Sequence, residues 1–300
     1  MTRHEFLQTS LGLAALAAAP AVAAPPKIAV KFYCPLWGNT LPPEAFAKRA
    51  REAGYDGVEL SIWPLGDRQA KDALIGAIRE QGLEIIVQQW QSGTESQVDK
   101  HLALLEAVLR DAAAVRPRFI NSQTGKDWYP FEQNVRIIER CLALERDLGV
   151  PIYHETHRGK FNFHALVTLP YLDRFPDLKM TADLSHWCNV SESLLSDQQA
   201  LMARALPHFR HIHARVGHAE GPQVSDPRAP EWKTALDAHL GWWDAIVQRR
   251  AAAGDRELTI APEFGPPTYL PTLPYTQQPV ADQWEINRFM MNLLRKRYEA

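Results

Sequence analysis

The stretch VPIYHETHRGKFNFHALVTLPYLDRFPDLKMTADLSH, residues 150–186, contains one complete unit of the pattern that decides the fold. An apolar strand is predicted at Ile152–Glu155, an amphipathic helix at Phe163–Arg174 and a second strand at Lys179–Asp183. Two strands joined by a helix are typical of a parallel sheet, because a parallel pair needs a long crossover connection.

The same alternation continues outward from this unit in both directions. Further strands are predicted at Ile28–Tyr33, Gly57–Leu60, Glu84–Gln89, Phe119–Ser122, His211–His213 and Leu258–Glu263. Further helices are predicted at Pro43–Ala53, Asp67–Gln81, Ser96–Ala114, Phe131–Leu148, Glu192–Ala205, Trp232–Arg250 and Val280–Arg297. This alternation favours an α/β fold with a single (β/α)8 TIM barrel, although an open doubly wound sheet remains possible because periodicity does not count closure. The glycine-rich turns of dinucleotide or nucleotide sites are missing.

Length and charge indicate one catalytic domain that acts on a small molecule. The chain has 300 residues and a formal net charge of −2, with no block of lysine or arginine. Nothing in this charge pattern indicates a nucleic-acid groove or binding to an anionic membrane surface. The three cysteines are far apart and form no CxxC pair, so they are predicted to be small buried side chains.

Residues 1–24 differ in character from the catalytic domain predicted at 25–300. Arg3 and His4 precede the apolar run Leu11–Ala19, and Ala21-Val22-Ala23 matches a cleavage site, so a signal peptide is predicted. The start is similar to a twin-arginine signal but has His4 at the second arginine, which leaves the route open. We expect export to the periplasm and no membrane contact after cleavage; the alternative is an alanine-rich helix on a cytoplasmic enzyme.

Four potential metal ligands stand at the ends of four consecutive predicted strands. These are Glu155, Asp183, His213 and Glu263, and alternation along each strand allows all four to point into the barrel. Three carboxylates and one imidazole suit Mn²⁺, Mg²⁺ or Co²⁺, with Zn²⁺ possible, and the absence of thiolate argues against structural zinc. Taken singly, such residues are more often helix caps or packed side chains. Arg158, Lys160 or Arg215 could instead neutralise the carboxylates in an internal salt-bridge network.

This arrangement resembles the sugar phosphate isomerase/epimerase (xylose isomerase-like) superfamily across Lys27 to Ala300. The features that carry the resemblance are a strand ending in Glu, one ending in D-x-x-H, an H-x-H strand and a last strand ending in Glu. The resemblance implies that Glu155 and Glu263 bind the metal and also exchange substrate protons, with Asp183 and His213 as the other ligands. It also implies that His186 binds a substrate oxygen. One departure is Ala219, where epimerases of the group often have an arginine, and Arg215 is the expected substitute.

Other polar and aromatic residues at the strand ends are candidate substrate contacts. His157, Arg158 and Lys160 follow the fifth strand and Gln123 follows the fourth. Trp37, Trp63, Trp90 and Trp187 could stack on a sugar ring, although packing at the rim is an equal alternative. Glu59 could support a ligand from behind or form a solvent ion pair. The long segments 217–231 and 265–279 are expected to form walls of the site.

Three functions remain open on these grounds. The first is a metal-dependent isomerase or epimerase of a free sugar, in which carboxylates move protons through an enediolate. The second is a lyase or hydrolase of 3-keto-glycosides that uses the same site. The third is a sugar-binding barrel without turnover. Endonuclease IV-like barrels resemble this pattern too, but they use a histidine-rich three-zinc site and a basic DNA face, which this sequence lacks. The sugar and the oligomeric state stay open.

Overall fold

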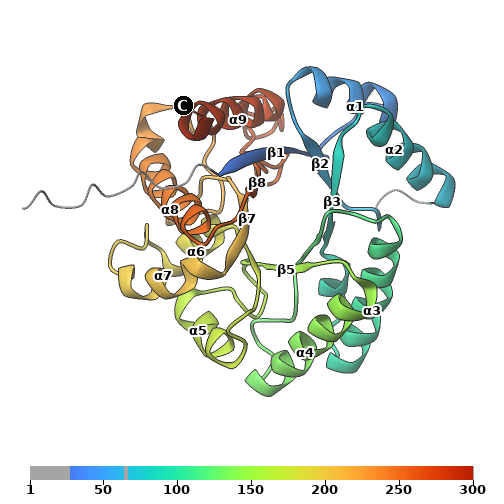
Figure 1. Cartoon of the computed structure of the whole chain (residues 1–300). Helices are drawn as coiled ribbons and strands as arrows, with labels where there is room; N and C mark the ends of the chain where they lie inside the picture. The colour runs from blue at the N-terminus through green and yellow to red at the C-terminus, as the bar shows by residue number, and fades with distance from the viewer. Residues whose placement is uncertain (1–27, 64–66, 300) are drawn as a thin grey trace, which may run out of the picture.

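A computed structural model describes residues 28–63 and 67–299, which form a closed barrel of eight parallel strands in sequence order (Figure 1). The strands are β1 (Ala29–Pro35), β2 (Gly57–Leu60), β3 (Glu84–Gln89), β4 (Ile120–Ser122), β5 (Ile152–Glu155), β6 (Met180–Ala182), β7 (Phe209–His213) and β8 (Glu257–Ala261). The predicted TIM barrel is confirmed, and closure comes from β1 pairing with β8. The signal peptide predicted at residues 1–24 lies outside the described range.

A ring of helices surrounds the barrel, as Figure 1 shows. The helices are α1 (Pro43–Glu52), α2 (Arg68–Glu80), α3 (Val98–Ala114), α4 (Phe131–Leu148), α5 (Ala165–Arg174), α6 (Leu184–Ser191), α7 (Gln199–Ala205), α8 (Lys233–Ala252) and α9 (Gln283–Glu299). Each turns an apolar stripe inward; in α3, for example, Leu105, Val108, Leu109 and Ala112 are buried at a spacing of three or four residues. None of the helices in the described part of the chain combines the length and apolar character that crossing a bilayer requires.

The helix predicted at Glu192–Ala205 is wrong over its first half. Instead, α6 begins directly after β6, and α7 covers only the second half of the predicted range. Asp183 caps α6, because its side chain accepts a hydrogen bond from the Ser185 backbone N–H at 3.2 Å. Glu192, with φ of 49°, ends α6 in the left-handed region.

The eighth strand ends at Ala261, two residues before the predicted end at Glu263. Pro262 has no N–H to continue the ladder, and Glu263 has φ of 53°, in the left-handed region. The backbone N–H groups of Phe264 and Gly265 are held by Asn287 Oδ1 and Gln223 Oε1, at 2.8 and 2.7 Å. The direction of the Glu263 side chain is therefore set by a braced turn and not by strand alternation.

The interior of the barrel is apolar at the bottom and polar at the top. Tyr33, Ile86, Phe119 and Ala261 form a small buried cluster, and Phe119 stacks on Tyr153 with ring centroids 4.2 Å apart. Above them the barrel contains buried carboxylates and imidazoles. The larger core lies between the sheet and the helices, and the three cysteines are buried and unpaired, as predicted. The polar upper layer is the region where a TIM barrel places its chemistry.

Candidate active site

A cavity of about 750 Å³ opens where the strands end. It is lined by residues that follow the strands: Pro35, Leu36, Trp37, Gly38, Asn39, Glu59, Leu60, Ser61, Gln88, Trp90, Gly93, Thr94, Gln123, Glu155, His157, Lys160, Arg215, Glu263 and Tyr269. Acidic, basic and aromatic side chains all face this one space. Such a combination of convergent polar groups with apolar walls is typical of a site for a small ligand.

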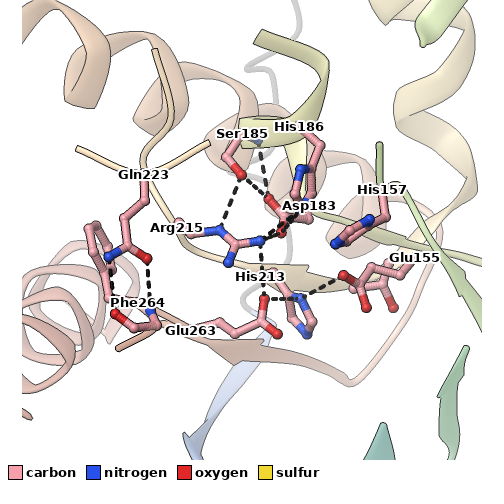
Figure 2. Close-up of polar contacts among 12 residues, drawn as sticks. Glu155, His157, Asp183, Ser185, His186, His213, Arg215, Gln223, Glu263 and Phe264 are labelled. Carbon is pink, nitrogen blue, oxygen red and sulfur yellow. Dashed lines mark hydrogen bonds and ion pairs between the residues drawn. The ribbon is translucent and has the colours of Figure 1, made fainter. Parts of the chain in front are cut away.

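The four predicted metal ligands converge at the floor of this cavity. Glu155 ends β5, Asp183 follows β6, His213 ends β7 and Glu263 follows β8. Each offers one ligand atom such that all four atoms lie within 4.8 Å of one another, and all four residues are buried. Figure 2 shows them turned toward a common centre around His213. Segments far apart in the sequence contribute to the same point, since Gln88 on β3 contacts Glu263 after β8, 175 residues further along the chain.

The two ring nitrogens of His213 face different groups. Nε2 lies 3.0 and 3.1 Å from the two carboxylate oxygens of Glu59. Because the charge of His213 and His211 holds the pKa of Glu59 low in spite of its burial, Glu59 accepts and Nε2–H donates. Nδ1 lies 2.5 Å from Glu263 Oε2 and 3.8 Å from Glu155 Oε1. The predicted support of a ligand by Glu59 agrees with this geometry.

Arg215 occupies the other side of the cluster. Its guanidinium forms a buried ion pair with Asp183 and lies 3.8 Å from Glu263 Oε2. Figure 2 shows it between these two carboxylates. The internal salt-bridge alternative is therefore present for Arg215, whereas no ion pair joins Arg158 or Lys160 to the cluster among the described residues.

The cluster retains excess negative charge even with this arginine. Four buried carboxylates, Glu59, Glu155, Asp183 and Glu263, face two cations, Arg215 and His213. Burial disfavours the imidazolium, but the charges of Glu263, Glu59 and Glu155 outweigh it and raise the pKa of His213. Burial raises the pKa of Glu155, His213 opposes the rise, and the charges of Glu263, Asp183 and Glu59 add to it, with a net pKa of about 8. The raised pKa of Glu155 reports repulsion among these carboxylates, which a divalent cation would relieve.

The donor set fits a hard or borderline divalent ion. Glu263 Oε2 and His213 Nδ1 face each other closely, yet neither makes a hydrogen bond with suitable geometry in the described part of the chain. Buried polar atoms that lack a well-formed hydrogen bond are costly, and a cation that both of these atoms could bind would satisfy them together. Oxygen and imidazole ligands without thiolate suit Mn²⁺, Mg²⁺, Co²⁺ or Zn²⁺.

Two amides that the sequence analysis did not recognise as part of the ligand cluster hold the acidic groups in place. Gln88 Nε2 donates to Glu155 Oε2 at 3.2 Å and to Glu263 Oε1 at 2.8 Å, so it bridges these two carboxylates. Asn121 Nδ2 donates to Glu59 and to Glu155, both at 3.0 Å. The only sequence signal for Gln88 was its place in the pair of glutamines that ends the strand EIIVQQ, and this place does not reveal its partner.

Most of the predicted substrate contacts lie at or beside the cavity. His157, Lys160, Arg215 and Gln123 line it. His186 is fully buried, with its ring 3.8 Å from the His157 ring and its Nε2 3.0 Å from an Arg215 nitrogen. Arg158 does not line the cavity, and its guanidinium lies 5.0 Å from the Tyr269 ring.

The predicted aromatic walls are only partly correct. Trp37 and Trp90 line the cavity, but Trp187 is fully buried and donates its Nε1–H to the Asn162 carbonyl at 2.9 Å. Trp187 belongs to α6, which faces the core, so its proposed stacking role is wrong. Trp63 packs against the core and does not line the cavity.

The two long loops differ in what they contribute. The segment 265–279 supplies Tyr269, an unpredicted cavity residue whose ring lies 4.9 Å from Trp37 and 4.7 Å from the Arg215 guanidinium. The segment 217–231 supplies no lining residue; its Gln223 instead braces the turn at Gly265.

Comparison with known families agrees with this architecture. The family described as xylose isomerase-like TIM barrel matches residues 47–231, more than half of the chain. No curated protein matches the sequence significantly.

Solved structures with the same fold have low sequence identity to this chain. A xylose isomerase domain containing protein from Salmonella typhimurium has a TM-score of 0.60 at 16% identity, over 90% of this chain and 97% of that one. A 3-keto-D-glucoside 4-epimerase from E. coli has a TM-score of 0.59 at 13% identity, over 90% and 100%. A probable 3-DHS dehydratase involved in petrobactin synthesis from Bacillus anthracis has a TM-score of 0.57 at 16% identity, over 88% and 98%. At these identities the likeness concerns the fold.

Proposed function

This chain belongs to the xylose isomerase-like TIM barrel family, and on that premise we propose that it is a divalent-metal-dependent sugar isomerase or epimerase. The observation that carries the proposal is the placement of Glu155 and Glu263 around His213 at the floor of the cavity. His213 Nδ1 lies 3.8 Å from one carboxylate and 2.5 Å from the other. Removal of a proton from one face of a carbon and its return on the other face takes two such positioned groups.

Glu155, Asp183, His213 and Glu263 would hold the metal ion. When bound, a divalent ion there would act as a Lewis acid on adjacent substrate oxygens and would orient them. Asp183 is also bonded to Ser185 and Arg215, which fixes its carboxylate. His213 is fixed from behind by Glu59.

Glu155 and Glu263 would move the protons. One carboxylate takes the proton from the carbon beside the substrate carbonyl, which creates an enediolate, and the other returns a proton to the substrate. Gln88 holds both carboxylates through its amide N–H groups, so they keep a constant separation. His157 and His186, whose pKa values are lowered by partial burial of the first ring and full burial of the second, would contact substrate oxygens as neutral imidazoles.

A lyase or hydrolase acting on 3-keto-glycosides is the second candidate. It needs the same first proton abstraction and, in addition, an acid that protonates the departing oxygen. Lys160 favours this reading, because its ammonium faces the cavity on the wall formed after β5. A sugar-binding barrel without turnover is favoured less, since binding alone does not require four buried carboxylates.

Metal analysis followed by solvent exchange tests the proposal. Purified protein should contain about one divalent ion per chain, and Asp183→Ala combined with His213→Ala should empty the site. Free sugars and 3-keto-glycosides are then incubated in heavy water with the metal-loaded protein. Deuterium should enter at the carbon next to the carbonyl during turnover. Full metal content in the double variant would refute the ligand set, and turnover without label would refute proton transfer through the carboxylates.

We also propose that the protein is exported to the periplasm after loss of residues 1–24. The charged start, the apolar run and the A-x-A pattern support it.

A further inference from the structure

One wall of the cavity carries a buried positive charge that the proposed proton transfer does not require. Lys160 follows β5, is 7% exposed and lines the cavity. In the described part of the chain, no carboxylate oxygen lies within 4.0 Å of its ammonium and no hydrogen bond from Nζ is present. An ammonium that faces a cavity without a partner is costly to bury, so a negative partner is expected there.

The backbone opposite Lys160 is shaped to admit this ammonium. Lys160 Nζ lies closer to Gly93 than a normal contact with a Cβ on residue 93 would allow, so a side chain there would displace the ammonium. Lys126 reaches the same place from the loop after β4 and donates its Nζ–H to the Gly93 carbonyl. Two lysines from different loops thus meet at one glycine beside the cavity.

The charges around this point strengthen the argument. Burial, together with the charge of Lys126, lowers the pKa of Lys160 to about 8, against the opposing charges of Glu155 and Asp127. This wall is therefore positive, whereas the floor formed by the four carboxylates is negative. A ligand that spans both must present neutral oxygens or a metal to the floor and negative charge to the wall.

We propose that Lys160, with Lys126 beside it, binds an anionic group of the substrate, so that the substrate class is an acidic sugar derivative and not a neutral sugar. The inference rests on the proposed function only in taking this cavity as the substrate site. The shared chemistry is an anionic oxygen group, either a carboxylate or a phosphate ester. Ammonium groups bind either of these, and the absence of a glycine-rich phosphate cradle after the last two strands favours the carboxylate.

Matched ligands and four variants test the inference. Binding is measured by calorimetry for D-glucose, D-galactose and D-mannose, for their uronates, and for their 6-phosphates. The variants are Lys160→Met, which removes the charge, and Gly93→Ala, which keeps the charge but displaces the ammonium. Lys126→Met removes the second charge, and Lys48→Met is the control, because Lys48 is exposed on α1.

The wild-type protein should bind the acidic member of at least one pair about tenfold or more tightly than the neutral sugar. Lys160→Met should abolish this preference, Gly93→Ala should reduce it, Lys126→Met should reduce it to a smaller extent, and Lys48→Met should leave it unchanged. A preference for uronates over phosphates identifies a carboxylate ligand, and the reverse identifies a phosphate ester. Equal binding of acidic and neutral members in every pair, no binding of any acid, or a preference that survives Lys160→Met would overturn the inference.

This binding experiment and the test of the proposed function can fail independently of each other. Metal content and solvent exchange report on Glu155, Asp183, His213 and Glu263, whereas the acid preference reports on Lys160. If the protein holds no metal and shows no solvent exchange but binds acids in a way that depends on Lys160, the anion site is supported and the proposed reaction is refuted. If the protein turns over a neutral sugar with deuterium entering from solvent and shows no preference for acids, the proposed reaction is supported and the anion site is refuted.

Discussion

His213 Nε2 lies 3.0 Å from Glu59 Oε1, on the side of the ring that faces away from Glu263. Glu59 is 4% exposed, and its Oε2 also lies 3.1 Å from His211 Nε2. His211 Nδ1 in turn lies 2.7 Å from Thr259 Oγ1. A chain of contacts from β8 through β7 to β2 therefore fixes the ring of His213. With Nε2 held in this way, Nδ1 is the nitrogen presented to Glu155 and Glu263.

Glu59→Gln should weaken metal binding although it removes no ligand. The amide cannot provide the negative charge that orients His213 and raises the basicity of Nδ1, so the expected loss of metal affinity is about 10–100-fold. Competition with a chelator measures it. Glu52→Gln, on the outer surface of α1, is the matched control. Unchanged affinity in Glu59→Gln would show that Glu59 does not position His213.

Glu155→Gln and Glu263→Gln should each lower turnover by about a hundredfold or more, the usual scale for a lost general acid or base. Metal content is measured in parallel, because both residues are also predicted ligands. Glu139→Gln, exposed on α4, serves as the control. Full activity in either variant at full metal loading would contradict the two-carboxylate mechanism and leave the barrel and the metal site untouched.

Lys160→Met should remove a pH dependence of stability above neutrality. The pKa of Lys160 falls from 10.5 to about 8 in the folded protein. Below about pH 8 both states bind the proton, and the folded state bears the cost of the buried charge. Between about pH 8 and 10.5 only the unfolded state binds it, so the free energy of unfolding rises with pH, by about 3 kcal/mol at most.

Urea unfolding of the wild type and of Lys160→Met across this range measures the difference. The variant should be the more stable protein at pH 7 and should gain less on going to pH 10. Parallel pH profiles of the two proteins would mean that the ammonium is not desolvated.

Trp187→Ala and Trp90→Ala should differ in what they damage. Trp187 is fully buried in α6, so its truncation should cost about 3–5 kcal/mol of unfolding free energy. Trp90 is 37% exposed at the cavity, so Trp90→Ala should change stability by only about 0.5 kcal/mol and weaken ligand binding instead. Chemical denaturation and ligand titration separate the two effects. A destabilisation of Trp90→Ala as large as that of Trp187→Ala would count against this assignment.

Protein isolated from its native host should begin near Ala24 and be found in the periplasm. The A-x-A pattern at Ala21-Val22-Ala23 sets the expected cleavage position. Mass spectrometry of cell fractions measures both features. Protein from the cytoplasm that retains residues through Leu11 would exclude export.

The sequence by itself determined the eight alternating units and the ligand types at the strand ends. Both are local properties: the spacing of apolar residues marks strands and helices, and a TIM barrel places strand ends at one face. The ranges of β2, β3, β5 and α4 agree with the predicted ranges to the residue. Glycines 54, 82, 149 and 254 adopt the positive φ that their position after a helix predicts.

Only the tertiary structure decided how these groups meet. Glu263 reaches the site through a left-handed turn held by Asn287 and Gln223, and Gln88 joins Glu155 to Glu263 although 175 residues separate Gln88 from Glu263. Trp187 lies in the core because α6 begins directly after Asp183. Such pairings depend on which strands become neighbours on closure and on turn geometry beyond the strands, and the periodicity of one chain segment contains no information about either.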